Sequence, residues 1–165
     1  MSLLNNIRAL LLGAWLGAAI FFSATVAPSA FRVLRTFNLP NQSEIAGALV
    51  SRTLSVINTS GFIVSLLLLV TAFAVKHRFS RRSFNLQIVL LMAVALANGV
   101  GEWVIAARMR ALRTAFGVPI DQVSMSDAGR IAFAALHGYS VIALSVALIA
   151  GLIAFFVISP RVTRT

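Results

Sequence analysis

The chain alternates between long apolar runs and short polar connectors. Four apolar runs lie at about residues 7–27, 54–75, 84–107 and 131–158. A helix of about 20 residues, rising 1.5 Å per residue, crosses the roughly 30 Å hydrocarbon core of a bilayer. The pattern therefore predicts an all-α, integral membrane, four-helix up-and-down bundle. At this length we expect one domain over residues 1–165.

The connector after the first apolar run has a helical pattern of its own over residues 38–53. Asn41 followed by Glu44 three residues later is a capping-box pattern, which marks a helix start. The apolar residues that follow recur at helical spacing. We expect a short amphipathic helix between spans one and two. The alternative is one continuous helix from about Gln42 to Val75.

Small residues indicate where helices pack closely. Gly13 and Gly17 form a GxxxG pattern in the first span, and Gly138 lies in the fourth. Small residues four apart let a neighbouring helix approach. We favour packing within the chain over homodimerisation, because three other spans need that surface. Pro28, after the first run, is expected to kink or end its helix.

The composition places the chain in the membrane class. It is 59% hydrophobic and 11% charged, with a mean hydropathy of +0.95, whereas soluble domains average about 25% charged residues. The net charge is +10, from 14 Lys and Arg against 4 Asp and Glu. These charges cluster in the connectors, which favours lipid headgroups over nucleic acid as their partner. The absence of cysteine excludes disulfides and thiolate chemistry.

The orientation follows from the connector between the second and third runs. Lys76, Arg78, Arg81 and Arg82 lie there within seven residues, and the positive-inside rule places such a loop in the cytoplasm. The two sides of the membrane carry equal numbers of basic residues. The orientation therefore rests on the high density of basic residues in this loop and on the basic C-terminal tail. We expect a multi-pass protein of the bacterial cytoplasmic (inner) membrane with both termini cytoplasmic and the first span retained as a signal anchor.

Polar residues of different spans reach the same depth. Glu102 lies 18 residues beyond Phe84, about 27 Å along its helix and so near the outer surface. His137 lies six residues after Ile131, about 9 Å below that surface, with Arg130 at the mouth. Ionisable groups inside a membrane span are costly and are therefore functional-site candidates.

Two asparagines extend this group. Asn98 precedes Glu102 by four residues and shares its helix face, and Asn58 enters the second span from the same side. Two interpretations stay open. In the first, Glu102 pairs with Arg130 or Arg108 and His137 donates to a backbone carbonyl, which pins helix three to helix four. In the second, the group forms a polar vestibule for a small solute, ion or proton.

The residues identify no cofactor, metal or reaction. A single intramembrane histidine excludes bis-histidine haem in a monomer, although a pair of His137 with Met92 or Met109 stays open. The chain has no phosphate-binding glycine loop, no HExxH and no GxSxG. Without a recognisable nucleophile and base, we do not expect an ordinary hydrolytic enzyme.

Short motifs along the chain resemble a known family. They are Trp15-Leu-Gly17 with Phe21-Phe22, Val26-Ala27-Pro28 with Phe31, Ala46-Gly47, and Arg130, Phe133, His137-Gly138 and Ser140. Together they resemble the transmembrane protein 205-like proteins, also catalogued as domain of unknown function 4149. The resemblance implies a four-helix integral membrane protein without an established activity, remotely similar to copper-resistance D type membrane domains. It also adds Ser140 to the vestibule candidates.

Three functions of different classes stay open. The first is a non-enzymatic protein that handles a small solute, ion or proton in the vestibule. The second is a structural or assembly subunit that has membrane-protein partners or forms a homo-oligomer. The third is a haem- or copper-associated protein, which the remote similarity suggests.

Overall fold

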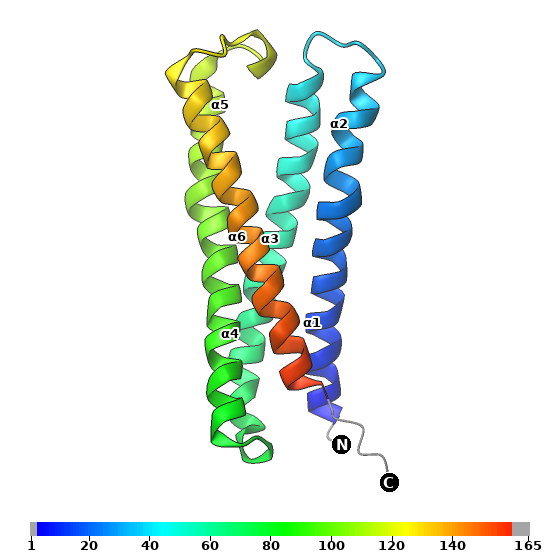
Figure 1. The fold of residues 1–165 in the computed structure, drawn as a ribbon, viewed down its shortest axis with the longest axis vertical. Helices are drawn as coiled ribbons and strands as arrows, with labels where there is room; N and C mark the ends of the chain where they lie inside the picture. The colour runs from blue at the N-terminus through cyan, green and yellow to red at the C-terminus, as the bar shows by residue number, and fades with distance from the viewer. Residues whose placement is uncertain (1–2, 160–165) are drawn as a thin grey trace.

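Four long helical rods form the whole fold. In a computed structural model, which describes residues 3–159, they are Leu3–Arg35, Gln42–Ala74, Arg81–Phe116 and Ala128–Ile158. Each is long and apolar enough to cross a membrane, and no strand occurs within residues 3–159. The predicted all-α four-helix bundle is confirmed (Figure 1). The protein is thus a multi-pass integral membrane protein.

Two of the rods contain a π-helical segment. The elements are α1 (Leu3–Phe21), η1 (Phe22–Val26, π) and α2 (Ala27–Arg35); α3 (Gln42–Ala74); η2 (Lys76–Arg78); α4 (Arg81–Gly99), η3 (Val100–Ala106, π) and α5 (Ala107–Phe116); η4 (Ile120–Gln122); and α6 (Ala128–Ile158). Each rod extends beyond its apolar run at one end or at both, because the helix continues into the connector residues.

The rods pack in a closed ring in chain order. α3 packs against α1, α2 and α4, and α6 packs against α4 and closes the ring on α1. α6 runs diagonally, from beside α5 at one end to beside α1 at the other (Figure 1). The end that carries the 36–41 and 117–127 connections is here named the distal end, and the end that carries the 75–80 connection is named the proximal end.

Trp15 of α1 lies at the centre of the packed core. Its ring N–H donates to the Ile57 carbonyl of α3 at 3.0 Å. Gly61 of α3 and Gly151 of α6 both face the indole closely, since a side-chain carbon at either would meet it. Trp15 thereby joins three rods, and its closest approach is to Gly61, where a side-chain carbon would lie 2.5 Å from Nε1.

The stretch expected to form a separate amphipathic helix is the first part of α3. The structure has the continuous alternative, one helix over Gln42–Ala74. Ala46 and Val50 are buried in the same helix as Ile57 and Asn58. Since the buried face continues without a break, no turn separates the amphipathic stretch from the span.

Pro28 does not end the first helix, which continues to Arg35. Proline has no N–H and its ring clashes with the carbonyl four residues earlier. The π segment η1 precedes it, and the Ala27 N–H bonds to the Phe22 carbonyl, five residues back. The wider π turn accommodates the proline without ending the rod.

The three glycines expected at helix contacts differ in their surroundings. Gly13 faces α6, where a side-chain carbon would lie 3.1 Å from the Phe155 ring. Gly17 and Gly138 do not pack on another helix in the described part of the chain, because a carbon at either meets no atom within 4 Å. Gly17 instead lies on the exposed face of α1.

Candidate functional site

A buried carboxylate lies near the distal end. Glu102 belongs to the π segment η3 and is only 6% exposed. Its Oε1 atom accepts hydrogen bonds from Ser55 Oγ at 3.0 Å and from Arg110 Nη1 at 3.2 Å. Its Oε2 atom is buried and has no partner among the described residues. Because the Arg110 side chain is 55% exposed, the pair joins a buried anion to a cation at the surface.

Glu102 lines a cavity, here named the distal cavity, with a volume of about 50 Å³. The third rod contributes Glu102, Arg110 and Arg113 to its wall, α3 contributes Ser55, and α6 contributes His137 and Ser140. A site that holds one water needs only about 10–15 Å³ of such volume. The distal cavity is therefore large enough for a few waters, a small ion or a small polar group.

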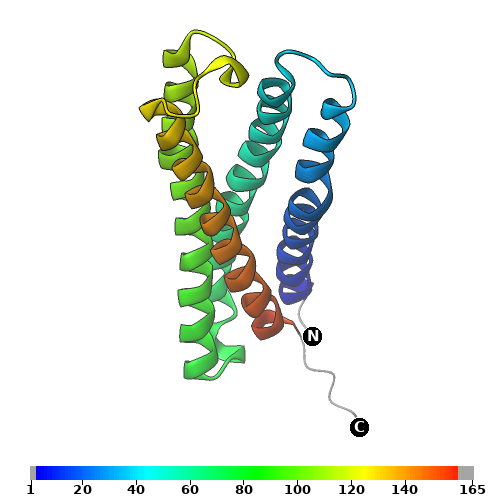
Figure 2. The ribbon, with the colours of Figure 1, turned by 45° about the horizontal axis from the view of Figure 1, so that its top comes forward.

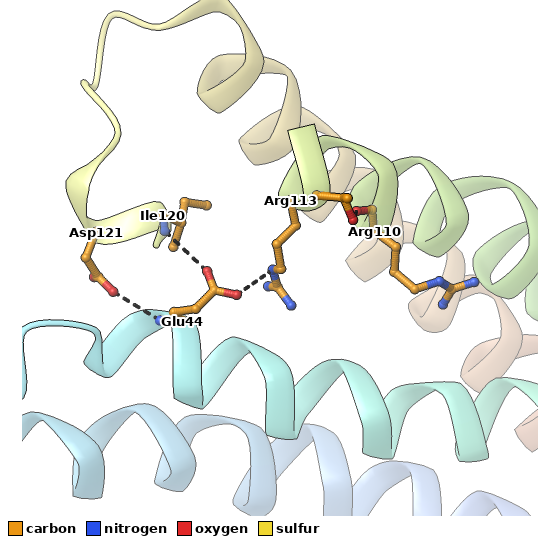
Figure 3. A network of polar contacts seen from close by, with 6 residues as sticks. Glu44, Arg110, Arg113, Ile120 and Asp121 are labelled. Atoms are coloured by element: carbon orange, nitrogen blue, oxygen red, sulfur yellow. Dashed lines mark hydrogen bonds and ion pairs between the residues drawn. The ribbon is translucent and has the colours of Figure 1, made fainter. Parts of the chain in front are cut away.

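A set of polar contacts, here named the distal clasp, ties the start of α3 to the end of α5 and to the 117–127 connection (Figure 3). Glu44 Oε1 lies 3.0 Å from Arg113 Nε, and Glu44 Oε2 accepts from the Ile120 N–H at 3.2 Å. The Glu44 N–H in turn donates to Asp121 Oδ2 at 3.1 Å. The start of α3 is thus capped by Asp121 from a distant connection, and the side chain of Asn41 makes no cap bond. The expected Asn41–Glu44 capping box is wrong for this reason.

Arg113 connects the distal clasp to the distal cavity. Its guanidinium lies 5.5 Å from the centre of the Phe133 ring of α6, a distance at which a cation is attracted to the ring face. On the other side it approaches Gly47 of α3, where a side-chain carbon would lie 3.0 Å from Arg113 Nη2. Arg113 therefore bridges α3 and α6 on the distal side of the cavity.

A comparison with protein families now identifies the chain. The family model described as Domain of unknown function (DUF4149) matches residues 10–116. The chain belongs to the DUF4149 family. No curated protein and no solved structure matches it. The matched residues include Ser55, Glu102 and the two arginines of the distal cavity, whereas α6 with His137 and Ser140 lies outside them.

The DUF4149 structure brings together three of the six residues predicted for the vestibule. Glu102, His137 and Ser140 all line the distal cavity, as their similar depths suggest. Among the hydrogen bonds of residues 3–159, none joins His137 to a backbone carbonyl, and Glu102 bonds to Ser55 and Arg110. The carboxylate and the imidazole thus share one cavity and are not a direct pair.

Arg130 does not belong to this group. Its guanidinium donates to the Ile120 carbonyl at 2.8 Å and to the Val123 carbonyl, so it holds the 117–127 connection. The pairing of Glu102 with Arg130 or Arg108, one of the two interpretations left open by the sequence, is therefore wrong, and Arg110 is the partner. The unsatisfied carbonyls of the connection attract Arg130 because it lies directly beside them.

The two asparagines are buried in the bundle beside the cavity and do not line it. Asn58 lies against Gly101, where a side-chain carbon would meet its Nδ2 at 3.2 Å. Asn98 donates to the Val94 carbonyl of its own helix at 2.8 Å, and its Oδ1 has no partner among the described residues. Both asparagines are thus parts of the packing around η3.

A second buried polar group lies at the proximal end of the DUF4149 bundle. Arg8 of α1 is 1% exposed, and its Nη2 donates to the Leu68 carbonyl of α3 at 3.2 Å. With the Gln87 amide oriented to satisfy both groups, its oxygen accepts from Arg8 Nη1 at 3.3 Å and also from Nη2. This contact was not predicted from the sequence; the signal that was missed is the matching depth of Arg8 and Gln87, each a few residues into its rod.

Potential metal ligands are sparse in the described part of this DUF4149 protein. No three side chains of His, Cys, Asp or Glu gather within residues 3–159. Met109 lines the distal cavity together with His137, whereas Met92 is exposed elsewhere. Of the two methionines considered as partners of His137, only Met109 shares its cavity.

Proposed function

We propose that this DUF4149 protein binds a small solute, ion or proton in the distal cavity, with Glu102 as the principal acceptor and His137 on the facing wall. The free Oε2 atom of buried Glu102 carries the proposal. A buried carboxylate oxygen without a hydrogen-bond donor is costly, especially in a membrane. A ligand that supplies a donor or a positive charge removes that cost.

Binding from one side fits the packing better than passage through the bundle. Beyond the cavity, the proximal half is filled by residues such as Leu12, Leu68 and Leu91, each at most 1% exposed. We further propose that the distal end faces outward, because the basic 75–80 connection favours the cytoplasm. In the bacterial cytoplasmic membrane the cavity would then receive its ligand from the outer side.

The two histidines provide a direct binding test. When the protein is labelled with ¹⁵N-histidine, the NMR signal of His137 reports on the distal cavity. The signal of His77, which is exposed in the proximal connection, serves as an internal reference. Sodium chloride, methylammonium chloride and methanol are added in turn as probes of a cation, an ammonium group and a neutral hydroxyl. We expect at least one probe to move the His137 signal and leave the His77 signal in place. The response should disappear in Glu102→Gln.

The control for that variant is Asp127→Asn, the same carboxylate-to-amide change at an exposed distal residue outside the cavity. It should keep the wild-type response. The proposed function is contradicted if the His137 signal responds to none of the three probes. It is also contradicted if the response in Glu102→Gln equals that of the wild type. We also expect Ser140→Cys to react with a small water-soluble thiol reagent, and a failure to react would show that the cavity is closed; the chain has no other cysteine.

An assembly role is the second candidate, supported by one face of α1. Ala14, Gly17 and Ala18 are exposed there, and small residues of this kind let another transmembrane helix pack closely. We expect Gly17→Leu to reduce an oligomer or co-purifying chain isolated in mild detergent, whereas Ile20→Leu, at another exposed position of α1, leaves it intact. A wild-type protein that is monomeric and isolated alone contradicts this role.

The finer family relationship stays a prediction. Similarity to transmembrane protein 205-like proteins and to copper-resistance D type domains rests on the short motifs alone. An optical spectrum and elemental analysis of the protein purified from its native membrane would test for the haem or copper that the latter similarity implies.

A further inference from the structure

A larger apolar groove adjoins the distal cavity. It has a volume of about 330 Å³, within the usual range of small-molecule sites, and lies between the first rod, α3 and α6. Its wall is mainly apolar and includes Phe22, Phe31, Val141, Leu144 and Leu148. This lateral groove and the distal cavity share Val50, Leu54, His137 and Ser140. The two spaces therefore meet at His137 and Ser140.

The lateral groove is open toward the lipid. The first and fourth rods pack together through α1 and α6, and both views show the upper part of α6 away from α2 (Figures 1 and 2). His137, Val141 and Ser145 are exposed along α6. From His137 to Leu148 the groove follows α6 for about 16 Å, from the distal cavity toward the middle of the bilayer.

Polar side chains in this groove differ from most others in the spans. Outside the groove, the hydroxyls of Ser60 and Ser65 bond to carbonyls of their own helix, and within it Ser23 does the same. His137, Ser140 and Ser145 make no hydrogen bond with any described residue, although all three border the groove. A polar group facing hydrocarbon without a partner is costly, so these three positions favour a ligand that is partly polar.

We propose that an uncharged lipophilic alcohol or phenol enters the lateral groove from the bilayer and places its hydroxyl in the distal cavity. This inference rests on the proposed function and names its ligand class. The apolar body lies along α6, and the hydroxyl donates to Glu102 Oε2. His137 and Ser140, at the junction, are available to the hydroxyl as further hydrogen-bond partners.

The charges of the distal cavity favour a neutral head group. Glu102 attracts an ammonium group, but Arg110 and Arg113 also line the cavity and offset that attraction. A carboxylate or phosphate is attracted by the two arginines but repelled by Glu102, and it cannot donate a hydrogen bond to the free Glu102 oxygen. A neutral hydroxyl both donates and accepts, so it satisfies Glu102 without adding a charge.

Competition among three molecules of equal chain length tests this preference. A diazirine-bearing twelve-carbon alcohol labels the purified protein on illumination, and 1-dodecanol, dodecylamine or dodecanoate competes. We expect labels on α6 between residues 137 and 148 and on the first rod near Phe31. Dodecanol should compete about tenfold better than the other two, because its neutral hydroxyl donates a hydrogen bond to the charged Glu102 acceptor.

Neighbouring residues of α6 provide matched variants. Ser145 lines the groove and Val146 does not, although both are exposed. Ser145→Phe should abolish labelling by filling the groove, and Val146→Phe should leave labelling unchanged. Val141→Phe is a second filling variant in case Ser145→Phe fails to fold. Glu102→Gln should weaken competition by dodecanol roughly fivefold, because a neutral acceptor bonds less strongly.

Each outcome has a definite meaning. Equal competition by the amine or the acid overturns the neutral head group, and undiminished labelling in both folded filling variants overturns the groove. If dodecanol does not compete but the His137 signal still responds to small polar probes through Glu102, the lipophilic ligand is wrong and the proposed function stands. If both experiments are negative, the proposed function fails as well.

Discussion

Replacing Gly61 with alanine is expected to lower the free energy of unfolding by about 3 kcal/mol, at the upper end of the usual cost of overpacking a core. The new carbon would lie 2.5 Å from Trp15 Nε1 and 2.6 Å from Trp15 Cε2. The indole cannot move away easily, since Nε1 donates to the Ile57 carbonyl and the far edge of the ring faces Gly151. The methyl group must therefore separate α3 from α1.

Unfolding in mixed detergent micelles measures this cost. Gly138→Ala is the control, because a carbon there meets no described atom within 4 Å and alanine favours the helix by up to about 1 kcal/mol. In a Trp15→Phe background the second ring of the indole is absent, and the cost of Gly61→Ala should shrink markedly. An equal cost in both backgrounds would show that the indole is not the cause, which is the purpose of the double-mutant cycle.

The glycines also show what a sequence pattern leaves undecided. The GxxxG spacing of Gly13 and Gly17 indicates a close helix contact, and Gly13 does face Phe155, but Gly17 faces outward. The closest contact is instead made by Gly61, which belongs to no recognisable motif. Spacing gives the face that two residues share, whereas the direction of that face depends on where the large partner, here Trp15, is placed.

The candidate site could be predicted in part. Depth along the helices, calculated from a nearly constant rise per residue, groups Glu102 with His137, and both residues line the distal cavity. The partner Arg110 could not be found in this way, since hydropathy ends the span near residue 107 while the helix continues to Phe116. The π segment η3 also changes the angular phase after Gly99, so residue spacing alone does not give the faces of Arg110 and Arg113.

The distal connections were the least predictable part of the chain. Asp121 caps a helix 77 residues away in the sequence, and Arg130 turns to the carbonyls beside it instead of to Glu102. Both contacts depend on the path of the 117–127 connection. A loop path of this kind is determined by tertiary contacts such as the distal clasp, for which the local sequence provides no signal.

Replacing Gln87 with leucine is expected to lower the free energy of unfolding by about 3 kcal/mol or more, because it leaves a buried cation without its side-chain partner. Arg8 is 1% exposed and its Nε has no partner in the described structure. It depends on the Leu68 carbonyl of α3 and on the Gln87 amide of α4. The variant thus weakens the contact that joins three rods at the proximal end.

Removing both polar partners should recover most of the free energy of unfolding that Gln87→Leu alone loses. In Arg8→Met with Gln87→Leu, the site becomes apolar at similar volume, and such replacements of buried polar pairs are often neutral. Gln122→Leu, the same change at an exposed distal position, should alter stability little. The free energy of unfolding is measured in mixed micelles for the wild type, Gln87→Leu, the double variant and Gln122→Leu. A double variant as unstable as Gln87→Leu alone would mean that Arg8 stabilises the bundle through its own contacts, independently of Gln87.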